Sequence, residues 1–151
     1  MKKLPLDARV WVYQSNRILT DLDKQTILSA SKQFVSEWAA HGTSLQSDVE
    51  VIDDYFLVLA VDENIASASG CSIDSSVKFV KAIGNELNID FFNRLNVVVT
   101  NGVETKLISF HDLAAYKSYK VYNPLVNTIQ QLNENFLQEV VESDFYKMLV
   151  G

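Results

Sequence analysis

The sequence of 151 residues has few of the residues that crosslink or break a chain: one cysteine, two prolines and five glycines. A single cysteine cannot form an internal disulfide, which fits a reducing compartment. So little proline and glycine argues against a long linker or a disordered segment. No apolar run approaches the roughly 18 residues that a membrane span requires. With 48% hydrophobic and 21% charged residues, residues 1–151 are expected to form a single globular domain.

The sequence also lacks an excess of positive charge. Its formal net charge is −6, its pI is about 4.8, and its lysines are scattered. We therefore expect neither nucleic acid nor a membrane surface as a partner. The N-terminus carries the lysines typical of a signal peptide, but Asp7 and Arg9 interrupt the apolar stretch that such a peptide needs. We therefore expect a cytoplasmic protein.

The hydrophobic pattern predicts strands alternating with helices. The clearest helix begins after Thr20, a suitable cap, and ends near Gly42, since glycine adopts the left-handed conformation without strain. Asp53 and Asp54 fit a turn between two strands, the second of which is strongly apolar and expected to be buried. The expected elements, in chain order, are strand 9–14, helix 21–41, strands 44–52 and 55–61, helix 74–88 and strand 95–100.

Asn101 and Gly102 separate two apolar alternations, which favours a type I′ turn and a hairpin with residues 103–110. Further helices are expected over residues 111–119, with Ser109 as cap, and over residues 125–141. The first six elements match the split arrangement of ferredoxin-like domains. The predicted fold class is therefore α+β: an antiparallel sheet in ferredoxin-like β-α-β-β-α-β order, with an added hairpin strand and C-terminal helices.

Cys71 is the first candidate for chemistry. It comes just before a predicted helix, and the positive end of a helix dipole favours a thiolate. A nucleophilic cysteine also needs a base, and His41 and His111 are the two histidines of the sequence. The alternatives are that Cys71 is a small buried side chain in a tight turn, as free cysteines commonly are, or that it lines a ligand site.

The residues around Cys71 also offer amide and hydroxyl groups to an anion. Ser69, Gly70 and Ser72 could hold a phosphate or carboxylate at the start of the helix. Asp74, however, would repel an anion there, and we expect it to cap the helix instead. The segment lacks the GxxxxGK[ST] sequence whose lysine reaches nucleotide phosphates, which excludes a P-loop ATPase.

Asp62 and Glu63 follow the buried strand and are candidates for a general base or for metal ligands. The sequence has no CxxC, HxxxH or HExxH spacing, so we expect no metal and no cofactor. Arg17, after the first strand, suits a bidentate contact with a ligand carboxylate. It could equally pair with Glu63 or Asp74.

Four segments resemble a family of small uncharacterised proteins of the Bacteroidetes. They are WVYQSNR (11–17), FVSEWAAHGTSL (34–45), ASASGCSIDSSV (66–77) and NIDFFNR (88–94). Members often carry the label "ABC transporter ATPase". This sequence does not support the label, because it lacks a phosphate-binding loop and an LSGGQ-like segment and is too short for that domain. The resemblance brings no catalytic residues, but it implies that the polar, small and aromatic residues of the four segments share one surface.

We expect a binding domain for a small ligand or a protein partner rather than an enzyme. The predicted cleft comprises Asn16, Arg17, His41, Gly42, Thr43, Ser69, Gly70, Cys71, Ser72 and Asp74. In it Arg17 would pair with a charge, His41 would form a hydrogen bond, and Gly70 would let a ligand approach the backbone. Two alternatives stay open: a thiol-dependent enzyme using Cys71 with His41, and a self-assembling structural or regulatory module, which would be a homo-oligomer.

Overall fold

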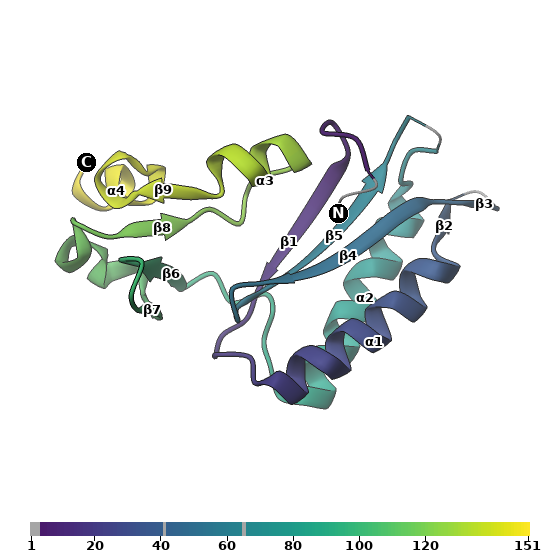
Figure 1. Ribbon diagram of the computed structural model, residues 1–151, viewed down its shortest axis with the longest axis horizontal. Coiled ribbons are helices and arrows are strands. Elements are labelled where there is room, and N and C mark those ends of the chain that lie inside the picture. The colour runs from purple at the N-terminus through teal and green to yellow at the C-terminus, as the bar shows by residue number, and fades with distance from the viewer. Residues whose placement is uncertain (1–3, 41, 65) are drawn as a thin grey trace.

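Two antiparallel sheets form the centre of the molecule in a computed structural model that describes residues 4–40, 42–64 and 66–151. The first sheet has the strand order β1 (Arg9–Gln14), β5 (Phe56–Asp62) and β4 (Gln46–Ile52). The second has the order β7 (Thr105–Ser109), β6 (Asn96–Thr100), β8 (Lys120–Tyr122) and β9 (Leu137–Glu139). Figure 1 shows the first sheet in the middle, with the second sheet on one side of it and the two long helices, α1 (Asp21–Glu37) and α2 (Gly70–Leu87), on the other.

Strand β5 is buried on both faces. Residues 55–61 are all less than a tenth exposed, which confirms the expectation of a buried strand here. Its neighbours are antiparallel, with Val12 opposite Val58 on β1 and Val49 opposite Leu59 on β4. A strand can be apolar on both faces only where a layer covers each face, and the structure supplies both layers.

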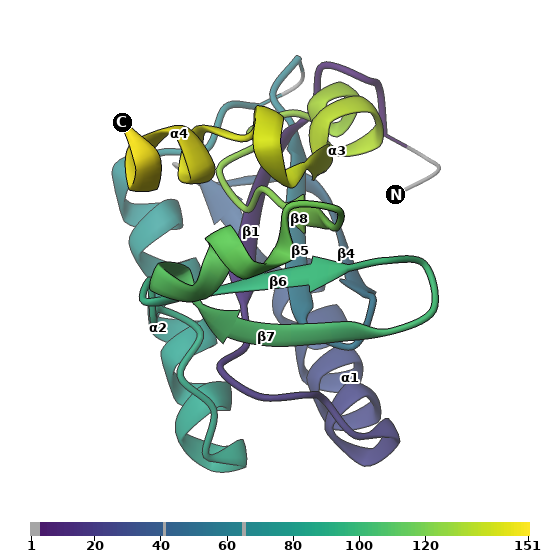
Figure 2. The ribbon, with the colours of Figure 1, turned by 90° about the vertical axis from the view of Figure 1, so that its left-hand side faces the viewer.

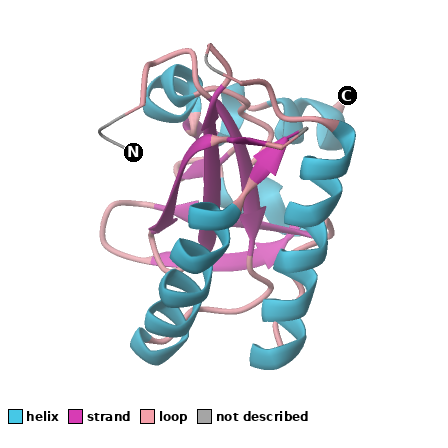
Figure 3. Ribbon diagram, turned by 90° about the vertical axis from the view of Figure 1, so that its right-hand side faces the viewer, coloured by secondary structure: helices cyan, strands magenta, loops and turns pink. Residues whose placement is uncertain are grey.

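Helices α1 (Asp21–Glu37) and α2 (Gly70–Leu87) cover one face of the first sheet. Figure 3 shows them side by side across the strands. Thr20 caps α1, as predicted, in a reciprocal pair of bonds with Asp23. The helix ends at Glu37, earlier than expected, because Trp38 takes an extended conformation and buries its indole in the core. The short strands β2 (Ala39–Ala40) and β3 (Thr43–Ser44) follow and pair with each other.

The second sheet packs on the other face of the first, and its strands run across those of the first sheet (Figure 2). Phe56 and Val58 of β5 meet Val98 of β6, together with Tyr122 and Phe136, in this second core. The ring centroids of Phe56 and Phe136 are 4.9 Å apart in an edge-on arrangement, a favourable geometry for aromatic pairs.

The C-terminal residues cover the outer face of the second sheet with short helices. These are η1 (Phe110–Tyr116), η2 (Val140–Glu142) and α4 (Asp144–Val150), while α3 (Ile129–Asn135) packs against the core between the sheets. Ser109 caps η1 as predicted. The expected helix over residues 125–141 is wrong: Thr128 caps α3, and the chain after Phe136 returns to the sheet as β9.

Of the two turns predicted between strands, one differs in conformation from the expectation and one lies where it was predicted. The loop between β6 and β7 is four residues long, because Thr100 pairs with Thr105. Gly102 has a φ of 90°, whereas Asn101 is not among the residues with positive φ, so the expected type I′ turn is wrong. Asp53 and Asp54 take positive φ values of 49° and 63° in the β4–β5 turn, which the sequence placed correctly.

The α+β class with antiparallel sheets is confirmed. Apart from the short pair β2 and β3, the elements follow the expected order along the chain as far as β6. Strand β6 nevertheless pairs with β7 and β8 instead of with β1. In a ferredoxin-like sheet the last strand lies beside the first, so this exchange leaves most of one edge of β1 without a neighbouring strand. None of the described helices is both long and apolar enough to cross a bilayer.

Candidate functional site

Arg17 lies in the turn between β1 and α1, and other parts of the chain hold its guanidinium. Its Nη1 donates to Asp23 Oδ2 at 2.6 Å, and its Nη2 donates to the carbonyl oxygen of Leu87 at 2.8 Å. The guanidinium lowers the pKa of Asp23 to about 2. Arg17 thus ties α1 to the end of α2, and it pairs with Asp23 rather than with Glu63 or Asp74.

Asn16 serves the same end of the molecule. Its Oδ1 accepts a hydrogen bond from the backbone N–H of Asp90 at 3.0 Å, which fixes the loop after α2. Both predicted polar residues of this turn therefore hold structure together at the C-terminal end of α2.

Ser69 to Ser72 form the opposite end of α2. The Ser69 hydroxyl accepts from the N–H of Ser72 at 3.1 Å, and Ser72 Oγ accepts from the N–H of Ser69 at 2.7 Å. Ser69 is therefore the cap. The expectation that Asp74 caps this helix is wrong, since Asp74 is an exposed residue within it. Gly70 is the first helical residue and has open space around it.

Cys71 is free and exposed on the first turn of α2. The interpretation of Cys71 as a small buried side chain is therefore wrong. The helix begins at Gly70, earlier than the sequence pattern indicated, so Cys71 lies within its first turn and not in a turn before it. His111 lies in η1, on the outer face of the second sheet. His41, the predicted partner of Cys71, lies outside the described residues.

Gly42 and Thr43 are exposed; Gly42 precedes β3, and Thr43 is its first residue, opposite Ala40 of β2. The indole Nε1 of Trp38 donates to the carbonyl oxygen of Ser72 at 2.9 Å, so the end of α1 and the start of α2 lie together. Two of the three predicted segments therefore meet at one end of the helical layer.

The third segment, with Asn16 and Arg17, lies elsewhere. Arg17 contacts Leu87, the last residue of α2, whereas Ser69 caps its first turn. An α-helix rises 1.5 Å per residue, so the 18 residues of α2 separate these ends by about 25 Å. Within the described residues, the structure does not bring the predicted site together in one cleft.

The two carboxylates at the end of β5 have structural partners as well. Asp62 Oδ1 accepts from the N–H of Asn64, and Glu63 Oε2 accepts from the N–H of Ala68, both at 3.0 Å. In the part of the chain that the structure describes, no group of three or more His, Cys, Asp or Glu side chains is placed to hold a metal ion.

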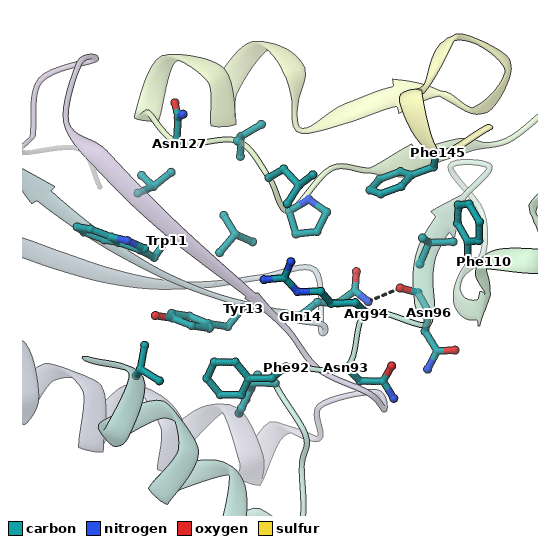
Figure 4. A pocket seen from close by; sticks show the side chains of 18 of the residues that line it. Trp11, Tyr13, Gln14, Phe92, Asn93, Arg94, Asn96, Phe110, Asn127 and Phe145 are labelled. Carbon is teal, nitrogen blue, oxygen red and sulfur yellow. Dashed lines mark hydrogen bonds between the residues drawn. The ribbon is translucent and has the colours of Figure 1, made fainter. Parts of the chain in front are cut away.

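A cavity of about 680 Å³ lies instead along the open edge of β1. All six residues of β1 line it, together with the loop that leads into β6 and the segment 124–127 between β8 and α3. Figure 4 shows β1 crossing this cavity between the helical layer and the second sheet. Its volume is within the range of small-molecule sites, roughly 300–1,000 Å³. The cavity exists because β6 leaves β1 for the second sheet.

Aromatic and aliphatic side chains form most of the walls. On the helical side, Tyr13 and Phe92 lie edge to face with centroids 5.6 Å apart, and Trp11 packs at 5.8 Å from Trp38. Burial raises the pKa of Tyr13, so its phenol is neutral near pH 7. On the other side, Leu125 and Met148 line the cavity although they are 67% and 74% exposed. These two side chains leave apolar surface at the rim of the cavity that a bound ligand would cover.

Two arginines supply the charge of the cavity. Arg94 extends into it from the loop before β6, alongside β1 (Figure 4). Arg9 lies over the indole of Trp11, 4.7 Å from the ring centroid. No aspartate or glutamate is among the described lining residues, although the chain has a net charge of −6. Positive charge is therefore concentrated in this cavity, against the overall charge of the protein.

The sequence interpretation missed this site because it placed residues 95–100 beside β1, where the cavity lies. A signal was nevertheless present. The segments WVYQSNR and NIDFFNR, two of the four on which the family resemblance rests, contain Trp11, Tyr13, Phe92 and Arg94.

Comparisons of the chain with protein-family models, curated proteins and solved structures gave no match. The resemblance to the Bacteroidetes family stays a prediction, and the function is argued from the geometry of the cavity.

Proposed function

We propose that this protein is a binding domain whose site is the cavity along β1, and that its ligand joins an apolar body to an anionic group. The observation that carries the proposal is the composition of the cavity walls. Apolar side chains surround about 680 Å³, and the formal charges among the lining residues are those of Arg9 and Arg94.

Arg94 is the residue best placed to receive the anionic group. No ion pair or hydrogen bond of its side chain is found within the described residues, whereas Arg17 is committed to Asp23. A guanidinium binds a carboxylate through two parallel hydrogen bonds. Arg9 is already stacked on Trp11 and adds positive potential. The apolar body would rest on Trp11 and Phe92.

Three ten-carbon probes test this proposal: decanoate, decanol and decylamine, each titrated calorimetrically into the native protein. Decanoate should bind with one site per chain and more tightly than the other two. A hydrogen bond to a charged group contributes about 1.5–3 kcal/mol, so Arg94→Gln should weaken decanoate binding at least about tenfold. Binding of decanol should not change.

The matched control is Lys32→Gln, which removes one exposed positive charge from α1 on the far side of the first sheet. It should leave the decanoate affinity unchanged. Equal binding of the three probes, or an equal loss in both variants, would show that Arg94 is not an anion site. If none of the three probes binds, the proposed function is contradicted.

The thiol-dependent enzyme and the self-assembling module stay predictions from the sequence. Cys71 is not among the described residues that line the cavity, so a reaction at its thiol would need a separate site. The cytoplasmic location and the ferredoxin-like relationship of the β1-β5-β4 half are proposals of the same standing. The order of these three strands and the two helices on one face support the latter.

A further inference from the structure

The open edge of β1 presents main-chain groups to the cavity. The N–H of Ser15 donates to the carbonyl oxygen of Tyr55 at 2.7 Å, so the odd-numbered residues of β1 face β5 with their main-chain groups. The even-numbered residues face the other way. The N–H of Val10 accordingly donates to the carbonyl oxygen of Asn127 at 3.0 Å, on the side opposite β5.

This second pairing covers the beginning of the strand and then stops. It consists of the bond at Val10 and of two bonds before the strand, from the N–H of Ile129 to the carbonyl oxygen of Ala8 at 3.0 Å and from the N–H of Gln130 to that of Leu6 at 2.9 Å. In residues 4–40, 42–64 and 66–151, no backbone hydrogen bond on this side continues the ladder to Val12 or Gln14. Their main-chain N–H and C=O groups therefore point into the cavity. Such an edge is a template for another strand.

The walls of the cavity suit a strand better than a compact molecule. Trp11 and Tyr13 contribute to the wall on the helical side, while Val10 and Val12 face the core between the sheets. A strand laid beside β1 would direct successive side chains alternately to these two walls, because side chains alternate along a strand with a period of two. The open edge from Trp11 to Gln14 would accommodate about four residues, or about 13 Å of extended chain.

We infer that the ligand of this cavity is an extended peptide segment, which adds a strand to β1 and places a carboxylate against Arg94. The inference rests on the proposed function and specifies its ligand class. Main-chain bonds to Val12 and Gln14 supply affinity, apolar side chains on both faces of the segment fill the two walls, and the charge of Arg94 selects acidic segments. The carboxylate belongs either to an aspartate or glutamate side chain or to a free C-terminus.

The test uses an N-acetylated pentapeptide of alternating valine and leucine, which is apolar on both faces, in three forms: free acid, amide, and amide with a central glutamate. Binding is measured on the full chain, together with hydrogen exchange of the Val12 and Gln14 amides. The free acid or the glutamate form should bind at least tenfold more tightly than the neutral amide, and whichever does so identifies the source of the carboxylate. At saturation, exchange at Val12 and Gln14 should slow at least tenfold.

Two controls isolate strand pairing. The tighter peptide, N-methylated at the residues whose N–H groups face β1, should lose binding, because the methyl groups block the ladder. Decanoate, which carries a carboxylate but no amides, should leave the exchange of Val12 and Gln14 within twofold of that in the free protein. Neither control alters the protein, so neither depends on the folding of a variant.

The outcomes separate the two proposals. If decanoate binds through Arg94 while no peptide slows exchange, the ligand is a small anion: the strand inference is overturned and the binding site stands. Equal binding of all three peptides would overturn the role of the carboxylate. Without peptide, exchange at Val12 and Gln14 could also slow as the protein concentration is raised. That result would assign the edge to a second copy of the chain and overturn the peptide inference. If neither decanoate nor peptide binds, both proposals fall.

Discussion

The side chain of Gln14 donates a hydrogen bond from its Nε2 to the backbone carbonyl oxygen of Asn96, 3.0 Å away and 82 positions along the chain. Gln14 ends β1 and Asn96 begins β6, so the two strands meet at one point through a side chain instead of a ladder. Beyond this point β6 runs across the first sheet (Figure 2). This contact marks one end of the cavity (Figure 4).

Replacement of Gln14 by alanine should destabilise the protein. Gln14 is 7% exposed, and its loss would leave the carbonyl oxygen of Asn96 without this partner. An unsatisfied buried group costs about 1–3 kcal/mol, and urea unfolding should show a loss of that size. Gln33→Ala is the control: Gln33 bonds Glu37 on the exposed face of α1, so the free energy of unfolding should change by less than about 0.5 kcal/mol. A similar loss of unfolding free energy in both variants would show that the bond from Gln14 to Asn96 contributes no more to stability than an exposed side-chain bond.

The ion pair between Arg17 and Asp23 should make the free energy of unfolding depend on pH in the acid range. The pKa of Asp23 is about 2 in the folded protein, against about 3.9 for an unfolded aspartate. Because the folded pKa is the lower, the stabilisation is fully present above about pH 4 and is lost as the pH falls toward 2. Asp23→Asn should therefore reduce the free energy of unfolding at pH 5 by about 1–3 kcal/mol.

The difference between wild type and Asp23→Asn should shrink as unfolding is repeated at pH 3 and at pH 2. Asp21, an exposed acidic residue in the same helical turn, provides the control. Its replacement by asparagine should cost less than about 1 kcal/mol, the size of a helix-dipole effect. A difference for Asp23→Asn that stays constant from pH 5 to pH 2 would rule out the linkage.

Two glycines of α2 should respond in opposite directions to alanine. A Cβ at Gly84 would lie 2.5 Å from the carbonyl oxygen of Ile89, where the chain leaves the helix, and relieving such a clash costs about 1–3 kcal/mol. Gly70 has open space around it and no positive φ. Gly70→Ala should therefore leave stability unchanged or raise it by up to about 1 kcal/mol. Thermal unfolding of the two variants tests this, and destabilisation by Gly70→Ala would contradict the described start of α2.

The thiol of Cys71 should react in the native protein, because it is exposed on the first turn of α2. Labelling with a disulfide reagent at neutral pH should proceed within a few-fold of the rate in urea. Such an ordinary rate is expected of any exposed thiol, whereas a rate far above that of the unfolded chain would support the enzyme hypothesis. A thiol that reacts only after unfolding would contradict both the exposure and the enzyme.

Local pattern predicted the individual elements better than their assembly. The cap at Thr20, the turn at Asp53 and Asp54 and the buried strand before Asp62 follow from short-range rules of capping, turn chemistry and apolar runs. The partner of β6 does not, because an apolar strand such as residues 95–100 can pair with any exposed edge. That choice depends on the C-terminal elements, where the sequence pattern predicted one helix over residues 125–141 in place of α3, β9 and η2.

The position of the candidate site depends on the pairing partner of β6. Polar residues in turns, such as Arg17 and Ser69, drew attention in the sequence but serve as ties and caps in the fold. Arg94 and Phe92 are candidate ligand-binding residues only because they line the cavity at the open edge of β1. A cavity made by an unpaired strand has no local signature, since it arises from the absence of a neighbour.

A titration of the isotope-labelled protein with decanoate, followed by amide NMR, tests the central claim most directly. We predict that the largest changes in chemical shift surround the cavity, at Val12, Gln14 and Arg94. In Arg94→Gln the affinity for decanoate obtained from these shifts should fall at least about tenfold. Shifts that centre on Cys71 and the exposed start of α2, or no shifts at millimolar decanoate, would contradict the assignment of the site to the open edge of β1.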